Sequence, residues 1–138
     1  KERKVKRQVS VLIFKKLTSI MYYKYIHYRM KEVSYQGYTI YIGENAEENQ
    51  HLVLNSNADD YWAHISDHPS AHAIICNPSG SRVNIKIIKR ACCLIKSANN
   101  KCKSISKLQF DVCRISNLVT SDTPGLVTLI DTPKKILI

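Results

Sequence analysis

A proline within a row of histidines constrains the fold of this chain more than any other feature. Segment 59–75 reads DDYWAHISDHPSAHAII, and its three histidines, His64, His68 and His72, lie four residues apart. On a helix they would share one face, as zinc ligands do. Pro69 lacks the amide hydrogen that a helix interior needs, and it disfavours helical geometry at His68. The segment is therefore predicted to form two antiparallel strands joined by a turn.

The register of these two strands decides which side chains share a face. If Ile65 pairs with Ala71, then His64 lies opposite His72, and Trp62 points to the same side. Directly opposed residues of an antiparallel pair project from the same face of the sheet. We expect Trp62 to be mainly structural. The histidines then either hydrogen-bond within the core or contribute to a binding site.

The clearest helical pattern lies at residues 84–98, NIKIIKRACCLIKSA. Apolar residues recur there at intervals of three, four and seven positions, which is typical of a helix with one buried face. We expect this face to pack on a sheet and the basic side chains to point outward. The apolar positions are Ile88, Ala91, Cys92, Ile95 and Ala98, and the basic ones are Lys86, Lys89, Arg90 and Lys96.

The remaining segments predict strands. Residues 37–43, GYTIYIG, place β-branched and aromatic residues between two glycines, as strands do. Segments 51–57 and 108–115 are also expected to be strands, and 124–138 a hairpin with its turn at 131–134. The predicted fold is a single α+β domain, in which a mostly antiparallel sheet carries one main basic amphipathic helix.

Charge is divided sharply along the chain, whose net charge is +10. Residues 1–31 carry ten basic residues and one acid, whereas residues 32–75 carry seven acids and no lysine or arginine. Residues 76–114 return to nine basic residues and one acid, and the last 24 residues balance. Such a division predicts a polyanion-binding face rather than a uniformly basic surface.

Residues 1–35 are predicted to be a basic arm, non-native or weakly ordered, that precedes a domain at 36–138. The first residue is not methionine, and clear patterning begins after Met30. We expect that the chain is a fragment or that natural translation begins at Met21 or Met30. Within the arm, YYKYIHYR (22–29) alternates aromatic and basic residues, as base-stacking surfaces do, although an ordinary amphipathic segment has the same pattern.

Several other chemistries are not expected. The four glycines form neither common phosphate-binding loop. The apolar run at 9–14 is far shorter than the ~20 residues that cross a bilayer, so no membrane association is expected. Five cysteines without paired spacing predict free thiols and a soluble, cytoplasmic protein. A zinc hydrolase would need a third ligand and a general base beside His64 and His72, and no motif supplies them. We expect no cofactor, no metal and no catalytic residue.

The motifs of this chain, taken in order, resemble those of the NFACT-R domain. They are GYTIYIGENAEEN, DDYWAH, PSAH, a helix carrying ACCLIKSAN, and PGLVT, and they span residues 36–138. NFACT-R is the RNA-binding domain of the NFACT proteins of ribosome-associated quality control. It also occurs in short stand-alone proteins of the coiled-coil-domain-containing 25 type. The resemblance implies a non-enzymatic module that binds tRNA or ribosomal RNA, with the ribosome or DNA as further partners.

The resemblance also assigns motif residues. The family's Asp-Trp-His element falls on Asp60, Trp62 and His64, and its second histidine on His72. Its G-x-N-x-x-x-N segment falls on residues 43–49, as Gly43, Asn45 and Asn49. This chain departs from the family at three places, one being Ser70-Ala71, where the small residue before the second histidine is often glycine. Glu44 stands where a basic residue is usual, and residues 114–122 are nearly neutral where the family is lysine-rich.

The expected RNA surface combines the motif with the basic helix. Because segment 32–75 has no lysine or arginine, phosphate contacts must come from elsewhere, and helix 84–98 has cations on one face. We expect the motif residues to shape a base- or sugar-contacting edge near these cations. The predicted nucleic-acid-binding residues are Asp60, Trp62, His64, His72, Arg82, Lys86, Lys89, Arg90, Lys96, Lys101 and Lys103.

Two other functions remain open at this point. A protein-interaction module would keep the same fold after losing RNA affinity, and a solvated helix face has the same charge pattern as a phosphate-binding one. A metal hydrolase built on the histidines is the alternative from the enzyme class.

Overall fold

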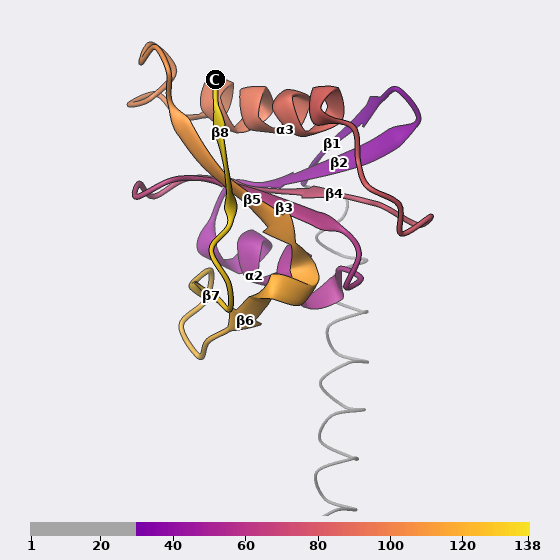
Figure 1. The fold of residues 1–138 in the computed structure, drawn as a ribbon. Helices are drawn as coiled ribbons and strands as arrows, with labels where there is room; N and C mark the ends of the chain where they lie inside the picture. Colours follow the sequence, from indigo (N-terminus) through magenta and orange to yellow (C-terminus); the bar gives the residue numbers. More distant parts are fainter. Residues whose placement is uncertain (1–29) are drawn as a thin grey trace, which may run out of the picture.

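An antiparallel sheet organises residues 30–138, the part of the chain that the computed structural model describes (Figure 1). Within these residues the sheet has six strands, and a second sheet has two. The large sheet has the order β1 (Lys31–Tyr35), β2 (Tyr38–Gly43), β4 (His72–Ile75), β3 (Tyr61–Ile65), β5 (Gln109–Arg114) and β8 (Lys134–Leu137). The small sheet pairs β6 (Leu118–Thr120) with β7 (Val127–Leu129), and a 3₁₀ turn (Ile115–Asn117) precedes it.

The two helices of the described residues lie on opposite faces of the large sheet. Helix α3 (Ile85–Ala98) packs across β2, β3 and β4 on one face. Helix α2 (Ala46–Asn55) contacts β2 and β4 from the other face, where β6 and β7 also lie (Figure 1). The sheet is therefore covered on both sides, and the predicted α+β class with a mostly antiparallel sheet is confirmed.

Side-chain alternation along the central strands supplies a separate core for each face. In β3, Ala63 and Ile65 face α3, whereas Trp62 faces α2. The larger core joins isoleucines of β2, β3 and β4 and Phe110 of β5 to the buried side of α3. The smaller core consists of Met30, Leu52, Val53, Trp62 and Ile74.

The predicted helix at 84–98 is confirmed as α3. Asn84 caps it, because its side-chain Oδ1 accepts a hydrogen bond from the Lys86 amide at 2.9 Å. The buried face differs slightly from the expected one, since Ala98 is exposed at the last helical position. The buried residues of α3 are Ile87, Ile88, Ala91, Cys92, Leu94 and Ile95.

The expected strand at 51–57 is wrong, because most of this segment belongs to helix α2. Asn45 caps the helix by accepting a hydrogen bond from the Glu48 amide at 2.9 Å. Asn49, Leu52 and Val53 then fall on one helical face and are buried against the sheet. Burial of these three residues against the sheet favours the helix and outweighs the β propensity of Val53.

The expected hairpin at 124–138 is also wrong. Strand β7 pairs with β6, whereas β8 pairs with β5 and closes the far edge of the large sheet. The two strands serve different cores: Val127 and Leu129 pack on the α2 side, and Ile136 is buried on the α3 side. The segment predicted to be the turn between them instead connects the small sheet to the large sheet.

Strand β1 extends the sheet beyond the expected domain start at residue 36. It pairs with β2 from Lys31 to Tyr35 through a two-residue turn at Gln36 and Gly37, whose φ angles are 47° and 82°. Two positive φ angles are typical of the tight type I′ hairpin turn. The predicted base-stacking stretch at 22–29 and the rest of the arm up to residue 29 lie outside the described residues.

Shortened chains test where the domain begins. A chain that starts at Met30 keeps every element described above, so we expect it to melt cooperatively within about 10 °C of the full chain. A chain that starts at residue 36 lacks β1 and exposes the edge of β2, so its midpoint should be lower. Differential scanning calorimetry of the three chains measures both effects. A larger drop for the Met30 chain would place essential contacts in residues 1–29.

Candidate nucleic-acid interface

Strands β3 and β4 bring the motif side chains together in the predicted register. Trp62 pairs with Ile74 and Ala63 with Ala73, so the next pair along is His64 with His72. The two imidazole rings lie 4.9 Å apart between centroids, at 86° to each other. The Trp62 ring stacks on His64 with centroids 5.5 Å apart and an interplanar angle of 4°. The predicted gathering of these three side chains on one face is confirmed.

A buried hydrogen bond fixes this cluster. The indole Nε1 of Trp62 donates to Nδ1 of His72 at 3.0 Å. Both residues are 3% exposed. Since Nδ1 accepts, a neutral His72 carries its proton on Nε2. Trp62 therefore has a structural role, as predicted.

Both histidines are held in the neutral form. Burial, with a smaller contribution from His64, lowers the pKa of His72 from 6.5 to about 3. Burial also lowers the pKa of His64, against opposing effects of the Ile65 backbone and the Asp111 carboxylate. Neutral imidazoles add no charge to attract phosphate near neutral pH.

The other motif residues secure this side of the sheet. Asp60 is 4% exposed, and its carboxylate accepts hydrogen bonds from the amides of Asn57 and Asn77, both at 2.8 Å. Asn49 of α2 accepts a hydrogen bond from the His72 amide at 3.2 Å. A Cβ atom on Gly43 would lie 2.4 Å from Asn49 Oδ1, so only glycine allows this approach. The motif thus connects α2, β2, β3 and β4.

The predicted basic residues occupy the opposite face. Lys86, Lys89 and Arg90 are exposed on the outer side of α3, and Arg90 lies 5.5 Å from the centroid of the Tyr35 ring. Arg82, Lys101 and Lys103 are also exposed. Lys96 is half-buried, and its Nζ donates to the Ile138 carbonyl at 3.2 Å.

The expectation that the motif lies beside these cations is therefore wrong. Trp62 belongs to the core on the α2 side, and the sheet separates it from α3. His64 and His72 share its face. Strand alternation causes the separation, because Ala63 and Ala73 take the positions under α3.

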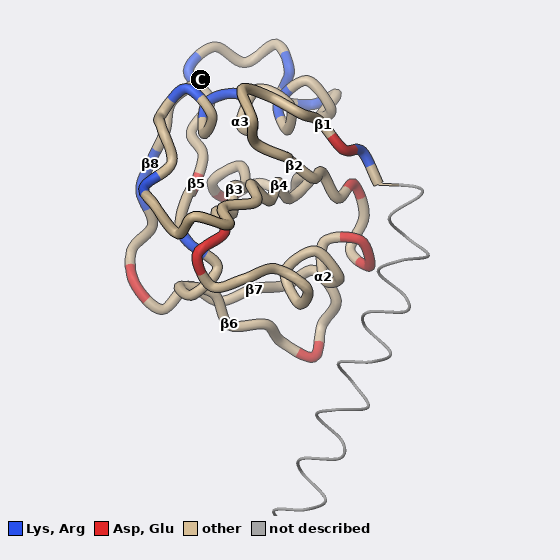
Figure 2. The backbone as a smooth tube through the Cα atoms, turned by 90° about the vertical axis from the view of Figure 1, so that its right-hand side faces the viewer, with Lys and Arg blue, Asp and Glu red and all other residues tan. Residues whose placement is uncertain are grey.

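Charge is segregated between the two faces. Residues 30–138 carry twelve basic and ten acidic residues, so the described part of the chain is almost neutral in total. Figure 2 shows lysine and arginine gathered around α3 and β8, and aspartate and glutamate mainly on the α2 side. The basic face results from this arrangement, not from an overall excess of positive charge.

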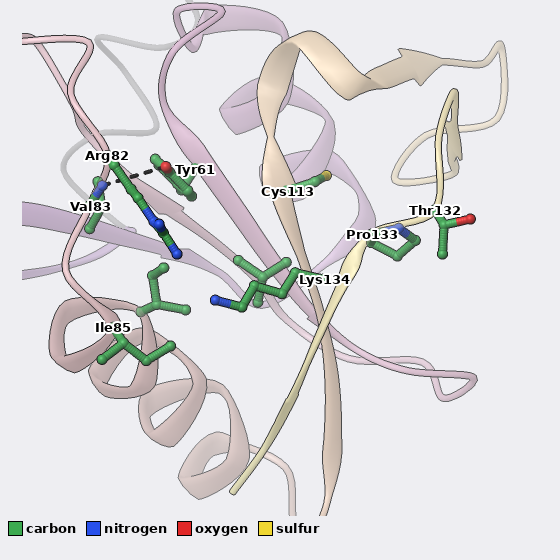
Figure 3. A pocket seen from close by; sticks show the side chains of 10 residues that line it. Tyr61, Arg82, Val83, Ile85, Cys113, Thr132, Pro133 and Lys134 are labelled. Atoms are coloured by element: carbon green, nitrogen blue, oxygen red, sulfur yellow. Dashed lines mark hydrogen bonds between the residues drawn. The ribbon is translucent and has the colours of Figure 1, made fainter.

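A cavity of about 290 Å³ opens on the basic side, between the start of α3 and the paired strands β5 and β8 (Figure 3). Arg82 and Lys134 line it together with aliphatic side chains. Sequence reasoning missed Lys134, because it comes near Arg82 only through the pairing of β8 with β5. No local pattern signals a pairing between strands so distant in sequence.

The described residues offer little for metal or thiol chemistry. Within residues 30–138 no group of three His, Cys, Asp or Glu side chains could hold a metal ion. The five cysteines are free. Burial raises the pKa of Cys92 to about 12, and it raises those of Cys76 and Cys113 to about 11, so these thiols are poor nucleophiles. Among the same residues no helix has the length and apolar character to cross a bilayer.

Comparison with known proteins gives a match to one family model and matches to several solved structures. The family model described as NFACT protein RNA binding domain matches residues 21–128. The structure is similar to that of the C-terminal part of the fibronectin/fibrinogen-binding protein from Streptococcus suis, with a TM-score of 0.69 and 20% identity. This match covers 79% of the present chain and 44% of the other. The comparison with curated proteins gave no match.

Replacing Trp62 tests the structural role of the motif. Trp62→Ala removes a buried ring and should lower the free energy of unfolding by roughly 3–5 kcal/mol. Trp62→Phe keeps most of the apolar volume but leaves His72 Nδ1 without its donor, which costs roughly 1–3 kcal/mol. Urea titration followed by circular dichroism measures both. If the two variants lost the same free energy of unfolding, the volume of the ring would contribute nothing beyond the hydrogen bond, and the prediction would be contradicted.

The lowered pKa of His72 predicts acid sensitivity. Since the folded pKa lies below the unfolded one, the neutral side chain stabilises the fold above about pH 6.5, and this contribution is lost as the pH falls toward 3. Between pH 6 and 4 this group alone should lower the free energy of unfolding by up to about 1.4 kcal/mol per pH unit. In His72→Asn the side-chain oxygen can accept from Trp62, and the slope should become shallower. His68→Asn, at an exposed position, is the control and should leave the slope unchanged.

Proposed function

The chain belongs to the NFACT protein RNA binding domain family, and from this premise we propose that it is a non-enzymatic RNA-binding module that contacts phosphates through the α3 face. This α3 face consists of the exposed side of α3 and the basic residues beside it. These residues are Arg82, Lys86, Lys89, Arg90, Lys101 and Lys103.

The observation that supports this surface is a set of cations without carboxylate partners. Among residues 30–138 the ion pairs are Arg114 with Asp59, at 2.9 Å, and Lys135 with Asp111. Neither pair involves a residue of the α3 face. Free cations on one rigid element can replace the counterions of an RNA backbone, which is the main source of affinity in such complexes.

The α2 side favours a single docking orientation. Its helix carries Glu47 and Glu48 in the first turn, and Glu44 lies just before it. These carboxylates repel phosphate, and they occupy the region where a basic residue is usual in the family. RNA that approaches the chain is therefore directed to the α3 face.

This surface is suited to an RNA recognised by its folded shape and not by its base sequence. Phosphate contacts fix the position of a nucleic acid but carry no sequence information. The motif residues are buried or face the α2 side, so Trp62 and the histidines support the fold and do not read bases. We propose tRNA or ribosomal RNA as the ligand, with DNA as a weaker one. We further propose that the chain is a stand-alone module of the coiled-coil-domain-containing 25 type and that it has a cytoplasmic role in ribosome-associated quality control, the process in which the NFACT proteins act.

One observation favours a second function, a protein-interaction module. Three aliphatic side chains on and beside strands β6 and β7 are at least half exposed: Val119 at 50%, Leu126 at 55% and Ile130 at 61%. Exposed aliphatic groups close together are typical of protein contact surfaces. They lie away from α3, so a protein partner and RNA need not compete.

Charge removal on α3 tests the RNA-binding proposal. In the triple variant Lys86→Ala, Lys89→Ala and Arg90→Ala, the fold should persist because all three side chains are exposed. Binding to a fluorescent tRNA should weaken. The dependence of log K on log salt should become shallower by up to about three phosphate contacts, at roughly 0.7–0.9 per contact. Fluorescence anisotropy at four salt concentrations gives the affinity and the slope.

A charge-matched control separates contact from long-range attraction. Ser116→Glu, Thr123→Glu and Thr128→Glu change the net charge by the same amount at exposed positions away from α3. This triple should reduce affinity less and leave the salt slope nearly unchanged. If the folded α3 triple keeps its affinity and slope, α3 is not the interface, and the protein-interaction function becomes the better explanation.

A further inference from the structure

The cavity beside α3 has the chemistry of a site for one nucleotide. We propose that it binds a single unpaired nucleotide, with the base against its aliphatic wall and the phosphate between Arg82 and Lys134. The proposal rests on the proposed function, because this nucleotide would belong to RNA that is held on the α3 face. It adds a subsite that distinguishes unpaired from fully paired RNA.

The aliphatic wall is suited to the flat face of a base. Its accessible part consists of Ile85 from α3 and Pro133 from the segment that leads into β8, and the buried side chains of Ile88 and Val112 lie behind it. Ile85 is 39% exposed, so its apolar surface stays in contact with water when the cavity is empty. Covering this surface with a base is favourable, because it removes apolar area from water.

The charged part of the cavity is suited to a phosphate. Arg82 and Lys134 enter from two different segments, and their charged ends point into the same space (Figure 3). No aspartate or glutamate is among the lining residues. Two carboxylates of the large sheet and the loop before it are engaged elsewhere, since Asp59 pairs with Arg114 and Asp111 with Lys135. Two cations that face each other without a carboxylate repel until an anion lies between them.

The position and size of the cavity limit the ligand further. Its volume of about 290 Å³ lies at the lower end of the range for small-molecule sites, which suits one nucleotide and not a stacked pair. It adjoins the first turn of α3, which has no acidic residue to neutralise the positive end of the helix dipole. Lys86 follows Ile85 directly, so the flanking phosphates of an RNA strand would reach the α3 face.

The first experiment uses free nucleotides on the full chain. Uridine 5′-monophosphate and adenosine 5′-monophosphate are titrated while amide shifts are followed by NMR, with adenosine and inorganic phosphate as comparison ligands. Both monophosphates should shift the amides of Val83 and Ile85 and bind at least about fivefold more tightly than either comparison ligand. Shifts confined to the outer side of α3, or equal binding of phosphate alone, would overturn the proposal.

Two matched variants locate the effect. Ile85→Glu places a carboxylate in the cavity, where it pairs with the two cations and repels phosphate, and glutamate is well tolerated in a first helical turn. Leu126→Glu makes the same exchange at an exposed residue near β7. Mononucleotide binding should fall about tenfold in the first variant and stay unchanged in the second. Should Ile85→Glu fail to fold, the double variant Arg82→Gln and Lys134→Gln tests the same contact.

The second experiment asks whether the nucleotide belongs to RNA. A blunt RNA duplex is compared with the same duplex carrying a one-nucleotide bulge, and the bulged form should bind about tenfold more tightly to the unchanged chain. Ile85→Glu should remove this preference, and Leu126→Glu should retain it. Salt-dependent binding without the preference would overturn the cavity proposal and leave the proposed function intact. If mononucleotides bind in the cavity but no RNA binds the chain, the proposed function fails instead.

Discussion

The hydrogen bond from Trp62 to His72 is the contact on which the rest of the domain depends. It joins β3 to β4 within the α2-side core, and the amide of His72 is in turn bonded to Asn49 of α2. Its geometry requires the strand register that pairs Ala63 with Ala73 on the other face. Two alanines in that position give α3 a flat, fully buried surface on which to pack. One register therefore satisfies a polar cluster on one face and close helix packing on the other, and a slip by one residue would lose both.

Burial changes what the histidine motif can do. A tryptophan between aspartate and histidine, with a second histidine nearby, has the residue types of a catalytic or metal site. Here Asp60 holds two loop amides, Trp62 holds His72, and desolvation keeps His72 neutral. Asp60 and Trp62 are engaged in hydrogen bonds of the fold, and His72 uses its Nδ1 in the same way, so these groups are poorly placed to act on a ligand. In the proposed function the charge for RNA binding comes from α3, an element that the motif positions only indirectly, through the sheet.

The sequence could predict those parts of the fold that depend on local pattern. Pro69 excluded a helix and led to the correct register of β3 and β4, and the spacing of isoleucine and alanine predicted α3. The errors fall where the structure depends on distant contacts. Helix α2 is stabilised by burial of Leu52 and Val53 against the sheet, and β8 joins β5 across more than twenty residues. Strand β1 is largely exposed, and its apolar alternation is limited to Val33 and Tyr35, which is too short a pattern to reveal a strand. The residues of the candidate surface were identified singly, but their division between two faces required the sheet.

The same division explains how a nearly neutral domain can attract a polyanion. A helix packed on a sheet separates the outer side of α3 from the opposite face by at least ~10 Å, which exceeds the Debye length of about 8 Å at physiological salt. A phosphate on α3 is therefore largely screened from Glu44, Glu47 and Glu48, although at low salt those carboxylates still act on an approaching RNA. Orientation and affinity thus depend on ionic strength in different ways. In the proposed complex both the acidic side and the cations of α3 guide RNA before contact, whereas affinity depends on the phosphates that these cations, together with Arg82 and Lys134 at the cavity, bind once counterions have been displaced. For the affinity of the proposed complex, the position of a cation beside an apolar surface then matters more than the net charge of the domain.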